Sequence, residues 1–319
     1  MKILYYPVYA AWFLLSLLPL WLLYALSDGF YLVLSKIVRY RYRVIWNNVS
    51  TSFPDRTEAE KRMIVDRFYA WLCDYFVETI KLMTMSRQQM RRRMRFEGIE
   101  PIERLTAEGR SVGIYLGHYG QWEWITSLPF WLSGTAQCAQ IYHPLENRTF
   151  DTIFRKVREK RGAVCIPMAE SLRKVVEYRT SGTPIILGYI SDQVPFWNNI
   201  HHWLDFLHHD TPVLTGTERM MKATHQAVFY ADIRREKRGY YTCEFKLIGQ
   251  DPKVFADFQL TDIYFGMLQA SIERDPSIYL WSHNRWKRTR QEFNMRYNEH
   301  TGRVDLRDIA TIRQEKGMR

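Results

Sequence analysis

Residues 111–123 have the sequence Ser-Val-Gly-Ile-Tyr-Leu-Gly-His-Tyr-Gly-Gln-Trp-Glu, and this stretch decides the fold. Its first part, 111–116, is a short apolar run bounded by glycines, which is typical of a buried β-strand. A turn follows at 117–120, and residues 122–132 can form a helix. A strand that leads through a tight turn into a helix is a building block of α/β proteins.

The same alternation continues along the chain. Helices are expected at 57–85, where Thr57 and Glu60 make a capping box, and at 101–107, 148–160, 170–180, 212–225 and 261–273. Strands are expected at 163–167, 184–191, 227–233 and, after a hairpin turn, 240–248. The pattern predicts an α/β fold with a central, mostly parallel or mixed sheet flanked by helices.

The composition is that of a folded protein with anionic partners. Of 319 residues, 46% are hydrophobic and 25% charged, which excludes disorder on compositional grounds. The net charge of +11 favours nucleic acid, an acidic membrane or a phosphorylated substrate as partner. Charge alone does not choose among these three.

The N-terminal segment favours the membrane. Ile3–Ser27 contains no charged residue, and about 20 apolar residues suffice to cross the hydrocarbon core as a helix. A cleaved signal peptide would have a shorter apolar region, whereas 21–24 continue the run here. We therefore expect one N-terminal membrane helix. Pro7 and Pro19 leave open whether it spans the membrane or lies in one leaflet.

Charges beside this segment predict its orientation. Only Lys2 precedes it, whereas basic residues follow it at Lys36, Arg39, Arg41 and Arg43. The positive-inside rule then places the body of the protein in the cytoplasm. The expected division is an anchor with its basic flank at 1–45, an α/β domain at 46–290 and a basic tail at 291–319. The four cysteines are scattered, which favours neither a zinc site nor a disulfide framework.

His118 and Glu123 are the candidate catalytic pair. On a regular helix a separation of five residues would put them on different faces. With His118 in the turn and Glu123 in the first helical turn, the carboxylate can reach back to the imidazole. Such a contact fixes one tautomer and lets the free nitrogen take a proton from an alcohol.

This region resembles the bacterial lipid A biosynthesis acyltransferases, the late or secondary acyltransferases. They belong to the lysophospholipid acyltransferase superfamily, whose hallmark is H-x4-D/E and whose fold is glycerolipid-acyltransferase-like. The matching motifs, in the same order along the chain, are Gly117–Glu123, Asn147–Arg158, Ser191–Gln193 and Trp281–Lys287. Two positions depart from the family pattern: Gln121 replaces the usual Asn, and 203–207 replace a Phe-Phe-Gly-like stretch.

The resemblance implies an O-acyltransferase. It would move a fatty acyl chain from an acyl carrier protein thioester to a hydroxyl of a lipid A precursor, with His118 as general base and Glu123 orienting it. The resemblance implies no cofactor or metal, and it implies a location at the inner membrane of a bacterium with the catalytic domain facing the cytoplasm. No covalent enzyme intermediate is needed, because the thioester is already activated. The absence of a G-x-S-x-G motif agrees with a mechanism without a serine nucleophile. The expected partners are acyl carrier protein, the acceptor lipid and an anionic membrane surface, rather than nucleic acid.

Further side chains are candidates for substrate binding. Arg155 and Arg158 lie three apart on an expected helix and can hold a lipid phosphate. Asp192 and Gln193 follow an apolar strand, where α/β sheets present functional groups. Gln121 completes the set because it lies within the H-x4-E motif.

Other functions remain possible on the sequence. The acceptor can be a lysophospholipid, a glycolipid or an amino-acid lipid. Spacings of four in a histidine cluster favour a metal-dependent membrane hydrolase if the cluster is helical, and its members are His201, His202, Asp205, His208 and His209. A non-catalytic protein that recruits partners to the membrane through its basic surface is a third alternative.

Overall fold

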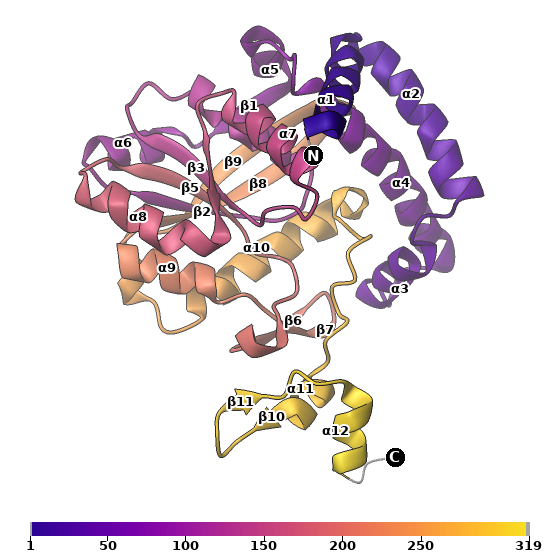
Figure 1. Cartoon of the computed structure of the whole chain (residues 1–319), viewed down its shortest axis with the longest axis vertical. Coiled ribbons are helices and arrows are strands. Elements are labelled where there is room, and N and C mark those ends of the chain that lie inside the picture. The colour runs from indigo at the N-terminus through magenta and orange to yellow at the C-terminus, as the bar shows by residue number, and fades with distance from the viewer. Residues whose placement is uncertain (1, 317–319) are drawn as a thin grey trace.

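The computed structural model describes residues 2–316 and contains one central seven-stranded sheet (Figure 1). The strand order is β1-β9-β8-β2-β5-β3-β4. Neighbouring strands are parallel except β8 and β9, which form an antiparallel hairpin. The strands are β1 (Met94–Glu97), β2 (Val112–Leu116), β3 (Gln137–Tyr142), β4 (Val164–Pro167), β5 (Ile185–Ile190), β8 (Ala227–Lys237) and β9 (Tyr240–Gly249). The predicted α/β class with a mostly parallel, mixed sheet is confirmed.

Strand β2 lies in the middle of the sheet, where its sequence predicts it to be. All five of its residues are buried, because helices cover both faces of the sheet. On one face the Tyr115 ring stacks on Tyr264, with ring centres 4.5 Å apart. Gly113 leaves room on the same face for the Met221 side chain. Strand β2 is therefore held between β8 and β5, and the turn that follows it starts from a fixed position.

Most of the predicted helices are present near their expected bounds, whereas the helices at 42–52 and 87–93 were not predicted. The long helix α4 starts with the predicted capping box, since Thr57 N donates to Glu60 Oε2 (2.7 Å) and Glu60 N donates to Thr57 Oγ1 (3.3 Å). The α-helices of the body are α3 (Tyr42–Ser52), α4 (Glu58–Lys81), α5 (Arg87–Arg93), α6 (Glu100–Ala107), α7 (Arg148–Glu159), α8 (Ser171–Thr180), α9 (Gly216–Thr224) and α10 (Gln259–Arg274). The 3₁₀ segments are η2 (Trp122–Phe130), η3 (Met168–Glu170), η4 (Trp197–Asn199), η5 (Pro252–Val254) and η6 (Pro276–Ile278). The predicted helix at 122–132 is thus a 3₁₀ helix, and Pro129 lies within it.

The N-terminal apolar segment forms two helices rather than the expected single one. Helix α1 (Lys2–Leu17) ends before Pro19, and α2 (Leu20–Leu32) begins after it and continues into a π-helical turn, η1 (Val33–Ile37). Proline lacks the amide that would continue the helical hydrogen bonds, which explains the break. Residues 20–37 make the one described helix that is long and apolar enough to cross a membrane by length and composition.

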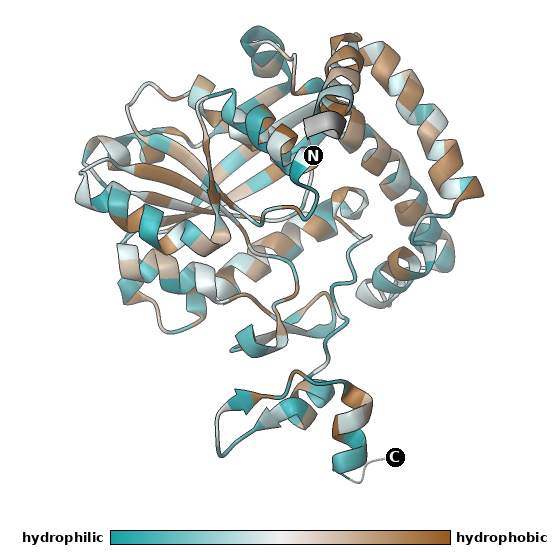
Figure 2. Cartoon of the chain, in the orientation of Figure 1, coloured by the Kyte–Doolittle hydropathy of each residue, from teal (hydrophilic) through white to brown (hydrophobic). Residues whose placement is uncertain are grey.

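Helix α2 has one side turned outward and one packed on α4. Trp21, Leu26 and Phe30 are exposed, and Figure 2 shows the apolar colouring along this helix. On the inner side, Tyr24 and Ser27 bond to carboxylates of α4. The helix therefore offers apolar surface outward while polar bonds fix it to the body.

The C-terminal part forms a small unit beside the main body (Figure 1). It contains α11 (Arg290–Arg296), β10 (Tyr297–Asn298), β11 (Arg303–Val304) and α12 (Ile309–Glu315). Arg296 is buried and donates to the carbonyls of Asp305 (3.0 Å) and Arg307 (2.7 Å). The sequence predicted only a basic tail here.

Candidate active site

The carboxyl ends of β2 and β5 bring His118 and Asp192 together. The strands are parallel neighbours, and Leu116 pairs with Ile190 in the register. His118 comes two positions after Leu116, and Asp192 comes two positions after Ile190. The imidazole Nδ1 lies 2.7 Å from Asp192 Oδ1, and the His118 amide donates to Oδ2 at 3.1 Å. One carboxylate thus fixes both the ring and the backbone of the histidine.

The carboxylate on His118 is therefore Asp192, and the expected contact with Glu123 is wrong. Glu123 is buried in η2 and accepts a hydrogen bond from Arg158 Nε at 2.8 Å, with a second from Nη2. The 3₁₀ helix directs Glu123 toward α7, whereas Asp192 stands on the adjacent strand. The sequence places Asp192 at a strand end, but the strand pairing that brings it to His118 is not visible there.

The electrostatics fit an ionised Asp192 beside a fixed imidazole tautomer. Burial raises the pKa of Asp192, but the attraction and hydrogen bonds of His118, together with the charge of Arg285, outweigh it and leave that pKa lowered. An ionised Asp192 accepts a hydrogen bond from Nδ1–H, so the lone pair lies on Nε2. Gln193 Nε2 is 3.3 Å from that nitrogen, as an amide donor to it. Nε2 can therefore accept a proton from a bound hydroxyl once that hydroxyl takes the place of the Gln193 amide.

The backbone of the His118 turn is held by the segment 278–280, which follows α10 and η6. Leu280 N donates to the His118 carbonyl at 3.1 Å, and Gly120 N donates to the Ile278 carbonyl at 2.9 Å. Gly120 has φ +61°, and a Cβ there would lie 2.6 Å from the Ile233 side chain. Only glycine meets both conditions without strain.

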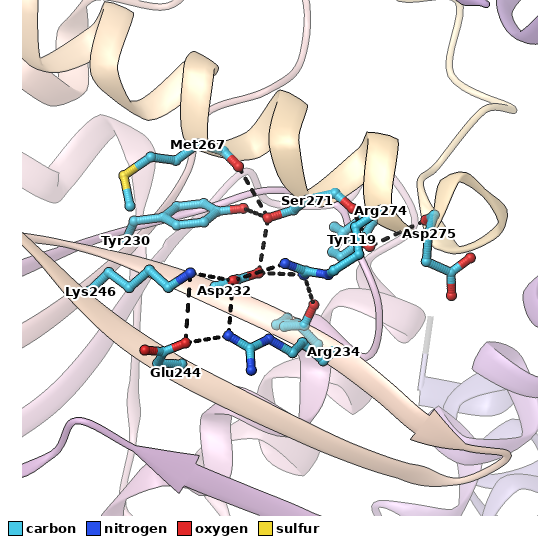
Figure 3. Close-up of polar contacts among 11 residues, drawn as sticks. Tyr119, Tyr230, Asp232, Arg234, Glu244, Lys246, Met267, Ser271, Arg274 and Asp275 are labelled. Atoms are coloured by element: carbon cyan, nitrogen blue, oxygen red, sulfur yellow. Dashed lines mark hydrogen bonds and ion pairs between the residues drawn. The ribbon is translucent and has the colours of Figure 1, made fainter.

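Tyr119 ties the turn to a buried charge network (Figure 3). Its hydroxyl donates to the Ser271 carbonyl at 2.6 Å. Ser271 Oγ donates in turn to Asp232 at 2.9 Å, and Lys246 (2.7 Å) and Arg274 (2.6 Å) donate to the same carboxylate. Arg234 also lies 3.7 Å from this carboxylate. Because Asp232 is only 1% exposed, its pairing with three cations satisfies a charge that would otherwise be costly to bury.

The motif Trp281–Lys287 lies near the pair, close enough for Asp192 to influence the pKa of both His283 and Arg285. Asn48 Nδ2 donates to the carbonyls of Trp281 (2.8 Å) and His283 (2.9 Å). Arg285 is 2% exposed and donates through Nη2 to the Pro212 carbonyl at 2.9 Å. Burial lowers the pKa of His283 to about 4, so this second imidazole is neutral near pH 7. The sequence marked this motif but not its place beside Asp192.

The remaining predicted substrate residues lie apart from the His118–Asp192 pair. Arg158 is occupied by Glu123 and is not a free phosphate ligand. Arg155 is half-exposed on α7, 3.9 Å from Glu159. Gln121 is fully buried and donates to Glu78 at 2.8 Å, so its side chain is turned inward. Of the predicted substrate set, only Asp192 and Gln193 touch His118.

The histidine cluster is not helical. Its residues lie in and beside the hairpin of β6 (Trp203–Phe206) and β7 (His209–Pro212), so a spacing of four does not align their side chains. His202 Nε2 lies 2.7 Å from Asp262, and His209 stacks on Trp286 with ring centres 4.0 Å apart. Within residues 2–316 no group of three or more His, Cys, Asp or Glu side chains is arranged to hold a metal.

A cavity of about 620 Å³ is lined by Tyr119 of the turn. Its other walls are the start of α4, the end of β8 and the end of α10. Its charged lining is Arg56, Glu60, Arg67, Arg234, Arg235, Glu236, Glu273, Arg274 and Asp275. His118 is not among its lining residues. The chemistry of this wall suits polar groups, not a fatty acyl chain.

Comparison with known proteins identifies the family. Residues 2–288 match the model of the bacterial lipid A biosynthesis acyltransferases. The chain belongs to this family. The matched region contains His118, Asp192 and the motif Trp281–Lys287, so the resemblance drawn from the sequence is confirmed.

Curated members of the lipid A acyltransferase family show partial similarity. A lipid A biosynthesis myristoyltransferase of Escherichia coli is 24% identical over 183 residues, which are 57% of this chain and 54% of that protein. Lipid A biosynthesis acyltransferase 2 of Shigella flexneri is 27% identical over 117 residues, 36% of each chain. A lipid A biosynthesis acyltransferase of Haemophilus influenzae is 20% identical over 181 residues, 57% of this chain and 55% of that protein. The aligned part thus spans about half the length of the longer matches.

Proposed function

We propose that this protein is an O-acyltransferase that moves a fatty acyl chain from an acyl carrier protein thioester to a hydroxyl of a lipid A precursor. The observation that carries the proposal is the His118–Asp192 pair at the carboxyl edge of a parallel sheet, where ligands bind in α/β proteins. The family match supports the reaction class and the acceptor. The donor and the roles of the residues are inferred from the chemistry of the site.

In this mechanism His118 is the general base. Its Nε2 takes the proton of the acceptor hydroxyl while the hydroxyl oxygen attacks the thioester carbonyl carbon. The tetrahedral intermediate collapses with cleavage of the carbon–sulfur bond, and the imidazolium returns the proton to the leaving thiolate. Asp192 stays ionised and stabilises the imidazolium through Nδ1, as the carboxylate of a serine-protease triad does.

Glu123 has a different role from the orienting one that its spacing predicted. We propose that the Glu123–Arg158 pair fixes η2 against α7 and so fixes the direction in which the chain leaves the His118 turn. A bidentate guanidinium–carboxylate contact suits this task because it has a defined geometry. Glu123 then acts through the loop, and His118 is oriented by Asp192.

The proposed reaction determines which cofactor and partners the protein would need. A thioester is activated before it binds, so the transfer needs neither a metal nor a covalent enzyme intermediate. Acyl carrier protein, an acidic partner, would meet a chain with a net charge of +11. The acceptor lipid would reach the site from a membrane in which α2 is anchored. The basic residues after the anchor favour the cytoplasmic side of the inner membrane.

Lipid analysis tests the proposal. Total lipids of cells with the gene, without it, and complemented with His118→Ala would be compared by mass spectrometry. We expect lipid A to lack one acyl chain in the deletion strain and in the His118→Ala strain. Unchanged lipid A with altered phospholipids would overturn the lipid A assignment in favour of a lysophospholipid acceptor. Full complementation by His118→Ala would overturn the catalytic role of His118.

A further inference from the structure

Glu78 of α4 is a fully buried carboxylate with three side-chain donors. Tyr24 of α2 donates its hydroxyl to Oε1 at 2.9 Å. Gln121, three residues after His118, donates through Nε2 to Oε2 at 2.8 Å, and Tyr241 of β9 donates to the same oxygen at 3.1 Å. Glu78 is 0% exposed. One carboxylate therefore joins the apolar helix, the catalytic turn and the sheet.

The hydrogen bond to Glu78 is the main polar restraint on the Gln121 side chain. Gln121 is also 0% exposed, and its Oε1 has no hydrogen-bond partner within residues 2–316. The amide plane is thus held through one nitrogen on one carboxylate oxygen. Nearby, Trp124 Nε1 lies 3.4 Å from the Glu78 carbonyl. A shift of Glu78 would be transmitted to the segment that connects His118 to η2.

The apolar helix determines where the carboxylate lies. Tyr24 binds Oε1, so the second oxygen is directed at Gln121 and Tyr241. The neighbouring polar contacts of α2 go elsewhere: Ser27 Oγ donates to Asp74 at 2.7 Å, and Tyr31 donates its hydroxyl to Asp66 at 2.6 Å. Neither of those carboxylates bonds to the 118–123 segment. Within the described residues, Tyr24 is therefore the one residue of α2 whose side chain shares a carboxylate with the turn, and that carboxylate is Glu78.

We propose that Glu78 is a positioning residue that couples the docking of α2 to the geometry of the His118 turn. When α2 is seated, Tyr24 fixes the carboxylate and the carboxylate fixes Gln121. When α2 is displaced, Oε1 loses its donor, and the Gln121 contact loosens with it. Acyl transfer is then most efficient when α2 is seated on α4. The activity readout of this inference depends on the proposed function.

The test compares two variants of the whole chain, each of which lacks one hydroxyl oxygen of α2. Tyr24→Phe deletes the donor to Glu78, and Tyr31→Phe is the matched control because it deletes a donor to a different carboxylate of the same helix. We expect Tyr24→Phe to lower kcat by about fivefold with KM unchanged, because the turn is mispositioned while substrate binding is intact. Tyr31→Phe is expected to keep kcat within about twofold of the wild type.

Hydrogen exchange gives a second readout that requires no activity. Amides of residues 117–123 should exchange faster in Tyr24→Phe than in the wild type, and at the wild-type rate in Tyr31→Phe. Equal exchange in all three proteins, or equal acceleration in both variants, would overturn the coupling. An inactive wild-type protein with the expected exchange difference would remove the proposed reaction and leave the coupling in place.

A double-mutant cycle separates coupling from general destabilisation. In a Glu78→Leu background neither acceptor oxygen remains, so Tyr24→Phe should change exchange at 117–123 less than it does in the wild type. Additive effects of the two substitutions would show that Tyr24 acts by another route and would overturn the proposal.

Discussion

At the scale of single residues, the chemistry depends on Asp192, which lies two positions beyond the end of β5. His118 and Asp192 are 74 positions apart in sequence and 2.7 Å apart in space. A spacing of five drew attention to Glu123 because H-x4-E can be seen in one segment. The 74-residue separation gives no such pattern, since it results from the pairing of β2 with β5. The sequence therefore shows which residue types are available for the chemistry, but not which of them contact each other.

Asp192→Asn should lower kcat on the order of 10²–10⁴-fold, because the amide NH2 can donate to Nδ1 and favour the wrong tautomer, and a neutral amide does not stabilise the imidazolium. Steady-state acyl transfer by the purified variant measures this. Glu123→Gln should lower the free energy of unfolding as well as activity, whereas Asp192→Asn should affect activity far more than stability. A near-normal kcat for Asp192→Asn would contradict the assignment of the pair.

The charge of Glu78 predicts a pH-dependent stability. Burial raises the pKa of Glu78 to about 7 from its ordinary 4.5, and the nearby charge of Asp74 adds to this, against hydrogen bonds from Gln121, Tyr24 and Tyr241 that lower it. The folded protein therefore binds a proton that the unfolded chain has released between pH 4.5 and 7. Its contribution to stability is fully present below pH 4.5 and is lost as the pH rises to about 7.

Glu78→Gln should remove this loss. The difference in unfolding free energy between variant and wild type should shift in favour of the variant as the pH rises from 4.5 to 7, because glutamine does not titrate. Urea unfolding in detergent at several pH values measures it. A difference that does not change with pH would show that Glu78 titrates at its ordinary pKa.

At the scale of elements, the Glu123–Arg158 pair joins η2 to α7. Glu123 has 4% of its side chain exposed, so removing the guanidinium leaves a buried and unpaired charge. Arg158→Met should lower the free energy of unfolding by about 3–5 kcal/mol. The double variant Glu123→Leu/Arg158→Met should be more stable than Arg158→Met, because it leaves no unpaired charge. Denaturant unfolding compares the variants; equal stability of the single and double variants would exclude a structural ion pair.

The elements with strong patterns were predicted, and the weak ones were missed. Strand β2 is a pure apolar run, and α4 has both a capping box and a helical period, so local sequence was sufficient for each. Strand β3 (Gln137–Tyr142) alternates poorly, and β1 (Met94–Glu97) lies at the sheet edge and is half polar. Tertiary pairing stabilises these two strands. The hairpin at 203–212 was missed because its turn uses left-handed backbone at Leu207 (φ 53°) and His208 (φ 63°), which residue type did not signal.

At the scale of the whole molecule, the apolar outer side of α2 is the proposed membrane contact. Trp21, Leu26 and Phe30 are 70%, 39% and 56% exposed, which is costly for side chains of this size in water. Replacing all three with serine should weaken binding to vesicles by more than tenfold, since burying each is worth about 1.5–3 kcal/mol. Co-sedimentation with vesicles measures this. Val254→Ser, at an exposed apolar position in η5, is the control and should bind as the wild type.

The whole account depends on the imidazole of His118, and a defined acyl-transfer assay tests it most directly. Purified wild-type protein and His118→Ala would be incubated with acyl carrier protein loaded with a fatty acid and with an under-acylated lipid A precursor. The products would then be weighed by mass spectrometry. The account predicts that the wild type adds one acyl chain and that His118→Ala adds almost none while retaining the wild-type melting temperature. Transfer by His118→Ala at the wild-type rate would contradict it.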